Sequence, residues 1–310
     1  MLRRAVTFLA VTGVLLATAA TPAAAATVAC RPGAGSPACV VWTGKVSWVP
    51  DGDTPLVDVY GDGTAEPLSI RLIGVQAMEQ SVYNPVVSKR RGECHALAAT
   101  ARVEQLVKAG GGIVRLTAQH ASSHSDVRNR PFRSIAVKIN GGWRDIGLDL
   151  IRNGYALWLP IPGEEAWNQQ YRVAAQQAAR AGKQMYDTDV CGSGPAQAAK
   201  LSMNVDWDKE LMTITNHSAG PVSLAGWWVR DSASRRYTFP SGAVVRAGQA
   251  IYVHVGKGTA TATHRYWGLP GPAFANPTFD SRAMGDGGYL FDPRGDLRAH
   301  DLYPCVVACQ

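Results

Sequence analysis

One turn-rich segment, residues 191–200, divides the chain into two parts with different patterns, and this division limits the fold more than any other feature. The segment has the sequence Cys-Gly-Ser-Gly-Pro-Ala-Gln-Ala-Ala-Lys and lacks alternating apolar residues. Before it, strand patterns are followed by helical patterns, whereas after it only short strand patterns occur. The length of 310 residues also suits two domains of about 150 residues each. The sequence therefore predicts an α+β domain over 27–191, a linker over 192–200 and an all-β domain over 201–310.

The first 26 residues have the composition of a secretory signal peptide. Arg3 and Arg4 precede an apolar run over 5–20, and the alanines at 23–26 complete the cleavage pattern. The apolar run is too short and too mild for a membrane span, and no other segment is a candidate. The sequence thus predicts a secreted, extracellular protein without a membrane span. Its net charge of +7 permits binding to a polyanion but does not by itself argue for it.

Six cysteines follow the predicted signal peptide. An even number of cysteines outside the cytosol favours disulfide bonds, although sequence alone cannot choose their connectivity. A zinc site would need tighter clusters of cysteine and histidine than this chain contains. Proximity along the chain favours three pairs: Cys30–Cys39, Cys305–Cys309 and, with the remaining two cysteines, Cys94–Cys191.

The strand and helix patterns of the first domain follow the order of a small barrel. Turns and alternation predict five strands, with one helix between the third and fourth strands and two more helices after the fifth. The expected strands are 40–49, 55–60, 68–75, 113–118 and 134–139, and the expected helices are 94–108, 147–153 and 164–181. Five short strands with a helix inserted after the third are typical of a Greek-key barrel of the OB type.

Three groups of charged residues in this domain are candidates for chemistry. The first is the motif Asp-Gly-Asp-Thr at 51–54, whose carboxylates suit a hard cation such as Ca²⁺, with an ordinary Asp-Gly hairpin turn as the alternative. The second is Arg71 inside an apolar strand, followed past the strand end by Glu79. A half-buried arginine needs an anion, and phosphate matches its planar fork, with a structural carboxylate pair as the alternative. The third is a basic segment over 128–133, where a solvated loop is the alternative.

In this order, the three groups resemble the staphylococcal (micrococcal) nuclease family, also called thermonuclease-like. The family pattern is DGDT, then R-L-x-x-V-x-x-x-E, a helix, a further arginine at the start of a strand and two helices, and the chain follows it over about 40–187. The resemblance implies an OB-fold nuclease, a Ca²⁺-dependent phosphodiester hydrolase that acts on DNA, with RNA as a further candidate substrate. Tyr155 and Trp158 lie near the positions of the family's base-contacting aromatic residues, with core packing as the alternative.

The resemblance also implies which residues are catalytic. They are Arg71, Glu79 and a later arginine. The R-x-I-A pattern favours Arg133 as the later arginine, whereas the spacing from Asp126 favours Arg130, and we expect Arg133. Physically, the arginines would stabilise charge on the phosphate, and Glu79 would orient the attacking water or accept its proton.

The implied metal site departs from the family pattern. Its ligands would be Asp53, Gln76 and the backbone carbonyl of Ala77, whereas the family commonly has Asp-Thr at the last two positions. The neutral Gln76 lowers the negative charge of the site, so we expect weak Ca²⁺ binding. The departure also keeps open a second hypothesis, a catalytically degenerate exported binding protein in which both domains hold ligands.

The second domain shows short strand patterns separated by turn residues. They are expected at 201–205, 210–216, 227–229, 236–239, 250–255 and 289–291, a spacing that indicates a β-sandwich. Three motifs resemble the lamin-tail domain, an immunoglobulin-like sandwich, over about 201–303: LAGWWVRD at 224–231, YTFP at 237–240 and GDGGYLFDPRGD at 285–296. The resemblance implies an accessory binding module of unknown ligand. Strand alternation predicts that Trp227 and Trp228 divide between core and surface.

Overall fold

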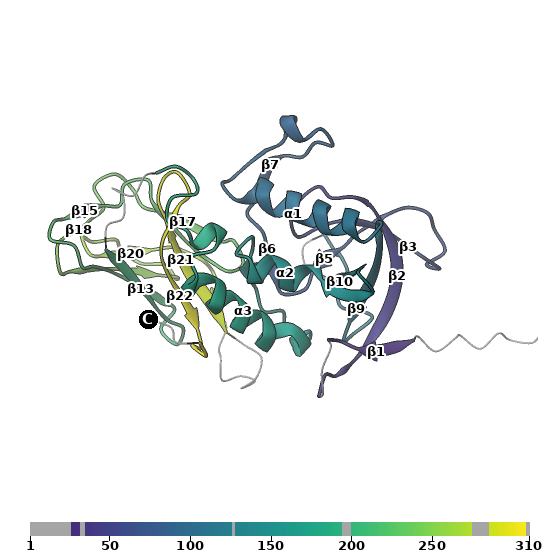
Figure 1. The fold of residues 1–310 in the computed structure, drawn as a ribbon. Helices are drawn as coiled ribbons and strands as arrows, with labels where there is room; N and C mark the ends of the chain where they lie inside the picture. Colours follow the sequence, from purple (N-terminus) through teal and green to yellow (C-terminus); the bar gives the residue numbers. More distant parts are fainter. Residues whose placement is uncertain (1–25, 32–34, 126–127, 194–199, 275–284, 308–310) are drawn as a thin grey trace, which may run out of the picture.

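The computed structural model describes residues 26–31, 35–125, 128–193, 200–274 and 285–307. The predicted signal peptide therefore lies almost entirely outside the described residues. The fold is mostly β, with 16% of the chain in helices, and it has two parts (Figure 1). No helix among the described residues is long and apolar enough to cross a membrane.

The N-terminal part is a nearly closed barrel, consistent with the OB fold expected from the sequence. Its strands are hydrogen-bonded in the order β11-β10-β9-β2-β3-β4, β1 pairs with β2, and β5 pairs with β10. Their bounds are β1 Thr27–Ala29, β2 Ala38–Trp48, β3 Leu56–Val59, β4 Leu68–Ser69, β5 Arg71–Leu72, β9 Ile113–Ala118, β10 Phe132–Ile139 and β11 Gly142–Asp145. Because Ile70 alone separates β4 from β5, the chain leaves one edge of the sheet and returns at once to β10. This return places Arg71 beside the first residues of β10.

Helices cover the barrel on one side, and two small strand pairs complete this part of the chain. Of the apolar positions that its helical spacing predicts, α1 buries Val103, Leu106 and Val107, whereas Leu97 and Ala101 are exposed. α2 begins after Asp145, whose carboxylate accepts hydrogen bonds from the Leu148 backbone N–H and from the Tyr171 hydroxyl of α3. The α-helices are α1 Ala96–Ala109, α2 Ile146–Arg152 and α3 Asn168–Arg180. The 3-10 helices are η1 Val87–Lys89, η2 Glu165–Trp167 and η3 Gln184–Tyr186. The two strand pairs are β6 Val75–Gln76 with β12 Leu157–Trp158, and β7 Gln80–Val82 with β8 Arg91–Gly92.

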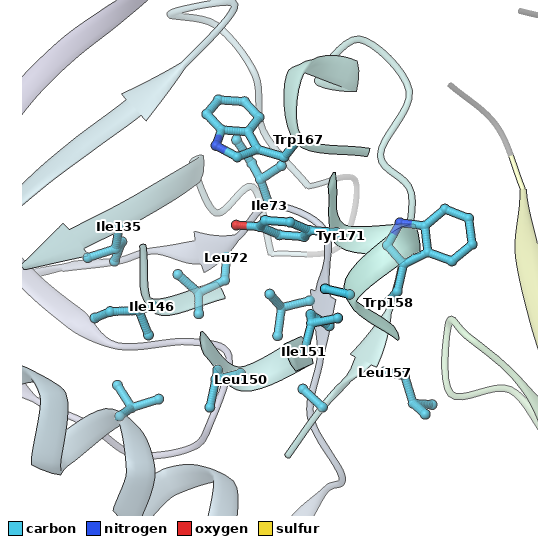
Figure 2. Close-up of a cluster of buried hydrophobic side chains, with 14 of the residues drawn as sticks. Leu72, Ile73, Ile135, Ile146, Leu150, Ile151, Leu157, Trp158, Trp167 and Tyr171 are labelled. Carbon is cyan, nitrogen blue, oxygen red and sulfur yellow. The ribbon is translucent and has the colours of Figure 1, made fainter. Parts of the chain in front are cut away.

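The barrel core meets α2 and α3 around the fully buried ring of Tyr171 (Figure 2). This ring occupies the space next to Gly74, where a Cβ would approach Tyr171 Cδ2 to 2.7 Å. Gly74 also has a φ of +75°, a conformation that side chains disfavour. Gly74 therefore permits the tight turn between β5 and β6. Around the Tyr171 ring, Figure 2 shows apolar side chains from several elements: Leu72, Ile73, Ile135, Ile146, Leu150, Ile151, Leu157, Trp158 and Trp167.

The C-terminal part consists of two four-stranded sheets, with strand orders β13-β14-β19-β20 and β17-β16-β21-β22, and a small pair β15-β18. The six strands expected from the sequence are present, and β15, β18, β20 and β22 were not expected. Apolar residues of both sheets share one buried core. The architecture confirms the predicted sandwich. The strand bounds are β13 Leu201–Asp206, β14 Leu211–Asn216, β15 Val222–Ser223, β16 Trp228–Asp231, β17 Arg236–Thr238, β18 Val244–Val245, β19 Ala250–His254, β20 His264–Tyr266, β21 Asp286–Phe291 and β22 Leu297–Tyr303.

The two parts share a packed interface. Trp228 of β16 stacks on Phe291 of β21 with the ring centroids 4.2 Å apart. α3 lies beside β22 (Figure 1), and its Gln176 donates to the carbonyl oxygens of Leu302 and Pro304, each at 3.0 Å. Side chains of the sheet β17-β16-β21-β22 therefore continue the buried cluster of the barrel: Trp228, Tyr289, Phe291, Leu297 and Leu302.

This interface overturns the expectation for the paired tryptophans. Both are buried, Trp227 with 6% and Trp228 with 5% of its surface exposed. Strand alternation does separate them, because Trp227 packs in the sandwich core and Trp228 packs in the cluster shared with the barrel. The prediction that one of them faces solvent is wrong, because the barrel domain covers the outer face of the sheet.

Two of the predicted disulfides are confirmed, Cys30–Cys39 and Cys94–Cys191. The second joins cysteines that are 97 positions apart and ties the start of α1 to the segment that leads into the sandwich. Cys305 is also disulfide-bonded, but its predicted partner, Cys309, lies outside the described residues. The described residues contain no free cysteine.

Asp286, at the start of β21, predicts a pH dependence of stability. Burial, together with the nearby charge of Asp231, raises the pKa of Asp286 to about 7 from an ordinary value of 3.8. Between these two values, the folded chain keeps a proton that the unfolded chain has released. The stability that this proton contributes is therefore fully present below about pH 4 and is lost as the pH rises through about 7.

We expect Asp286→Asn to remove this dependence, because asparagine keeps an acceptor oxygen for the Ser232 and Gly287 N–H groups but carries no charge. At pH 8 the variant should exceed the wild type in free energy of unfolding by about 2–4 kcal/mol, and the difference should shrink toward pH 4. Urea unfolding at several pH values measures this, with the exposed Asp208→Asn as the control. Parallel pH curves for the wild type and Asp286→Asn would contradict the expectation.

Candidate active site

The Asp-Gly-Asp-Thr turn follows β2 and packs against α1. Gly52 permits this close approach, because a Cβ at this position would lie 2.7 Å from the Cβ of Ala99. The neighbouring Asp53 is buried and uses both carboxylate oxygens. Its Oδ1 accepts a hydrogen bond from the Thr54 hydroxyl, and its Oδ2 accepts one from the Ala77 N–H, each at 2.8 Å. Asp53 thus joins the turn to the segment that follows β6.

The structure places Arg71 beside Asp53. Arg71 Nη1 lies 3.3 Å from Asp53 Oδ2 and donates to the Val75 carbonyl oxygen at 2.6 Å. Arg71 Nη2 donates to Gln76 Oε1 at 2.6 Å. The Gln76 amide in turn donates from Nε2 to Glu79 Oε1 at 3.2 Å. A continuous chain of polar contacts therefore runs from Asp53 through Arg71 and Gln76 to Glu79.

A second arginine reaches this cluster, and it is Arg130 rather than the expected Arg133. Arg130 Nη1 donates to the Thr54 hydroxyl at 2.9 Å. Arg133 instead donates to backbone carbonyl oxygens of the segment 121–123, at 2.9 and 3.1 Å. The Arg133 guanidinium lies 4.1 Å from the centroid of the Trp42 ring. The structure therefore groups Arg71 with Arg130 and leaves Arg133 outside the cluster.

Strand geometry explains this difference. β10 pairs in parallel with β5, with Phe132 opposite Arg71 and Arg133 opposite Leu72. Neighbouring side chains of a strand point to opposite faces, so Arg133 points away from the face that Arg71 occupies. Arg130 precedes the strand and reaches the cluster from the connecting segment. The R-x-I-A pattern thus located the strand but not the arginine that faces Asp53.

Burial and neighbouring charges shift the pKa values of this cluster. Burial, followed by the charge of Asp53, raises the pKa of Asp51 to about 7. The same two causes raise the pKa of Glu79. Burial, followed by the charge of Arg71, lowers the pKa of Arg130. Burial is thus the first cause of each shift, and the charge of a like-charged neighbour is the second.

The three expected Ca²⁺ ligands lie next to one another. The Ala77 N–H donates to Asp53, and the Gln76 amide donates to the Ala77 carbonyl oxygen at 3.2 Å. Burial, followed by the charge of Asp53, raises the pKa of Asp51, and a bound cation would favour the charged form of this carboxyl group. Gln76 offers only a neutral oxygen, which already accepts a hydrogen bond from Arg71. The oxygens are of the type that a hard cation prefers, but each already accepts a hydrogen bond from within the chain, and only Asp53 is charged.

A second group resembles a metal site in composition. Within the described part of the chain, Cys94, His95 and Cys191 form the one group of at least three Cys, His, Asp or Glu residues whose ligand atoms lie within 4.8 Å of one another. The two cysteines form a disulfide, so their sulfur atoms are not thiolate ligands. This group is a covalent tie between two parts of the chain.

Glu93 borders Glu79, and two arginines of the sandwich border Glu93; the sequence predicted none of these three as a site residue. The Glu79 N–H donates to Glu93 Oε2 at 3.3 Å, and the Glu93 N–H donates to the Glu79 carbonyl oxygen at 2.9 Å. From the sandwich, Arg230 Nη1 lies 3.4 Å from Glu93 Oε2, and Arg236 Nη1 lies 3.6 Å from Glu93 Oε1. Arg230 and Glu93 are 137 positions apart, and no local pattern connects them.

The candidate base-contacting aromatics have other environments. Trp158 is fully buried, and its Nε1 donates to Asn168 Oδ1 at 2.7 Å. Tyr155 is half-buried, and its hydroxyl accepts from Gln184 Nε2 at 3.4 Å. Trp158 therefore has the core-packing role that was the alternative.

Comparison with known families identifies the C-terminal part of the chain. The family model described as Lamin Tail Domain matches residues 186–303, which confirms the expected lamin-tail-like sandwich. No nuclease family matches the barrel. A search of curated proteins finds no match. The nuclease resemblance of the barrel therefore rests on its motifs and its geometry.

Proposed function

We propose that the chain is a secreted nuclease that hydrolyses phosphodiester bonds of DNA, with RNA as a further candidate substrate. The observation that carries this proposal is the convergence of Arg71 and Arg130 on the Asp53–Thr54 turn, in polar contact with Glu79 through Gln76. Guanidinium groups match the oxygens of a phosphate in shape and charge. Two such cations beside a carboxylate suit the attack of water on a phosphodiester, in which negative charge develops on the phosphate oxygens.

Each residue of the cluster has a separate task in this proposal. Arg71 and Arg130 stabilise the negative charge that develops on the phosphate oxygens. Glu79 orients the attacking water and accepts its proton. Its raised pKa suits this task, because a general base is most effective when its pKa is near the working pH. Asp53 holds the Arg71 guanidinium in place through their ion pair.

Ca²⁺ is the cofactor that we propose for this site, with Asp53, the Gln76 side-chain oxygen and the Ala77 carbonyl as its ligands. The cation would supply positive charge beside the reacting phosphate. Because only Asp53 carries charge among these ligands, we expect an affinity of about 1 mM, as in extracellular calcium modules. Secretion is supported by the signal-peptide pattern and is compatible with the disulfides.

A second candidate function is that of an exported nucleic-acid-binding protein without catalysis. Gln76 favours it, because a neutral amide joins Arg71 to Glu79 where the nuclease family has a carboxylate. A separate cavity of about 370 Å³ also favours it, because phosphate and base can be held by arginine next to an aromatic ring. The Arg115 guanidinium lies 4.5 Å from the centroid of the Trp143 ring there. Arginines from several elements line this cavity: Arg31, Arg115, Arg144 and Arg152.

Single substitutions test the two arginines. Arg71→Ala and Arg130→Ala should each lower the kcat for hydrolysis of single-stranded DNA by about 100-fold or more, the scale of losing one preorganised donor. Arg133→Ala should lower kcat by less than about tenfold, because Arg133 contacts Trp42 instead of the cluster. The measurement uses the purified chain from residue 27 onward with Ca²⁺ and with a chelator. Arg246→Ala, an exposed arginine of the sandwich, is the control.

Thermal unfolding of each variant separates loss of chemistry from loss of fold. A wild type that degrades no DNA at any Ca²⁺ concentration would favour the binding protein. A larger loss of kcat in folded Arg133→Ala than in folded Arg130→Ala would restore the assignment made from the R-x-I-A pattern.

Gln76→Asp tests the metal site. The added carboxylate should raise the Ca²⁺ affinity by about tenfold or more, because affinity for Ca²⁺ increases with the number of charged ligands. Gln76→Asn is the matched control, since it has the same size as the aspartate and no charge. Calorimetric titration of Ca²⁺ into the three proteins measures the difference. Equal affinities of the Asp and Asn variants would show that this side chain does not face the metal.

A further inference from the structure

We propose that Arg230 of the sandwich is a positioning residue for Glu79, so that the lamin-tail domain forms part of the active site. The inference rests on the proposed nuclease function for its effect on catalysis. Its structural basis is a series of two contacts. Arg230 on β16 of the sandwich contacts the Glu93 carboxylate, and Glu93 contacts the backbone of Glu79.

The contact between Glu93 and Glu79 fixes the backbone of Glu79. Both polar backbone atoms of Glu79 pair with Glu93: its N–H donates to the Glu93 carboxylate, and its carbonyl oxygen accepts from the Glu93 N–H. Glu79 directly precedes β7, and Glu93 directly follows β8, so these bonds continue the hairpin that the two strands form. The direction of the Glu79 side chain depends on this backbone. Glu93 therefore sets where the Glu79 carboxylate points.

The contact between Arg230 and Glu93 holds Glu93 in place, and Arg230 belongs to the other domain. Arg230 is 2% exposed, and its Nη1 lies 3.4 Å from Glu93 Oε2, the same oxygen that accepts the Glu79 N–H. The same nitrogen contacts the sulfur of Met78, the residue before Glu79. An ion pair with a buried arginine is costly to break, because removal of one partner leaves the other without compensation. Arg230 thus restrains both Glu93 and the residue next to Glu79.

Both ends of the Arg230–Glu93 pair are rigidly mounted. Arg230 lies on β16, which is paired on both sides, with β17 and β21. Two residues earlier on β16, Trp228 stacks on Phe291 in the domain interface. On the other side, Glu93 precedes Cys94, whose disulfide with Cys191 ties the start of α1 to the segment that leads into the sandwich. The backbones of both residues are therefore held in place, and within the pair the Arg230 side chain is buried whereas that of Glu93 is 32% exposed.

Arg236 provides an internal comparison. Its Nη1 lies 3.6 Å from the other Glu93 oxygen, but its side chain is 42% exposed. Exposed ion pairs contribute little, because water screens them and the side chains lose freedom. The Arg236 guanidinium also stacks over the Trp228 ring at 4.1 Å. Loss of Arg236 should therefore disturb Glu79 less than loss of Arg230.

The first experiment measures kcat and KM separately with single-stranded DNA. Arg230→Ala should lower kcat by about tenfold or more, because small displacements of a reacting group have large effects, while KM should change by less than about twofold. Arg230→Lys, which keeps the charge, should recover most of the loss. Arg236→Ala should lose less than Arg230→Ala, and Arg246→Ala, an exposed arginine of the same domain, is the control. A loss that Arg230→Lys does not recover, with a lowered melting temperature, would show that Arg230 is only structural and would overturn the proposal.

The second experiment does not depend on activity. Amide hydrogen exchange in the segment 78–83 reports the hydrogen bond between the Glu79 N–H and Glu93. Arg230→Ala should raise exchange at Glu79 by about tenfold, and Arg246→Ala should leave it unchanged. If the wild type hydrolyses no DNA, the proposed function fails while this measurement still tests the contact. Unchanged exchange in folded Arg230→Ala would overturn the positioning role.

Discussion

The packing of one sandwich sheet against the barrel domain is the interaction on which the rest of the structure depends. Trp228 and Phe291 extend the barrel's buried cluster into the second domain, and burial of apolar area of this kind stabilises by about 25 cal/mol per Å². Gln176 at its edge has both ends of its amide hydrogen-bonded to the backbone of residues 302–307, so it is buried without an unpaired group. The Cys94–Cys191 disulfide adds a covalent tie. The two domains are therefore docked as well as connected.

This docking determines the surroundings of the candidate site. The cluster itself collects four segments of the barrel: the turn after β2, strand β5, the segment after β6 and the segment before β10. The sandwich adds a fifth, because docking buries Arg230 against the carboxylate of Glu93. Without the second domain, Glu93 would have neither of the two arginines that approach it, and Glu79 would be held only from within the barrel.

Gln76 shows how one neutral residue changes the character of such a site. Asp51, Asp53 and Glu79 already bring three carboxyl groups there, and burial, followed by the charge of Asp53, raises the pKa values of Asp51 and Glu79. A further carboxylate would need a cation beside it. An amide instead accepts from Arg71 and donates to Glu79, so it connects a cation with an anion and adds no charge. Gln76 therefore adds hydrogen bonds to the cluster and leaves its net charge unchanged.

The sequence by itself determined the two fold classes, most strand positions and the residue types of the cluster. These features depend on alternation, turn residues and spacing, which are local along the chain. It did not predict that Arg130 rather than Arg133 faces Asp53, because the pairing of β10 with β5 decides which face each side chain occupies. Nor did it predict the burial of Trp228 or the contact of Arg230 with Glu93. Both features depend on how the sandwich packs against the barrel domain. Only the tertiary structure brings together residues so far apart in the chain.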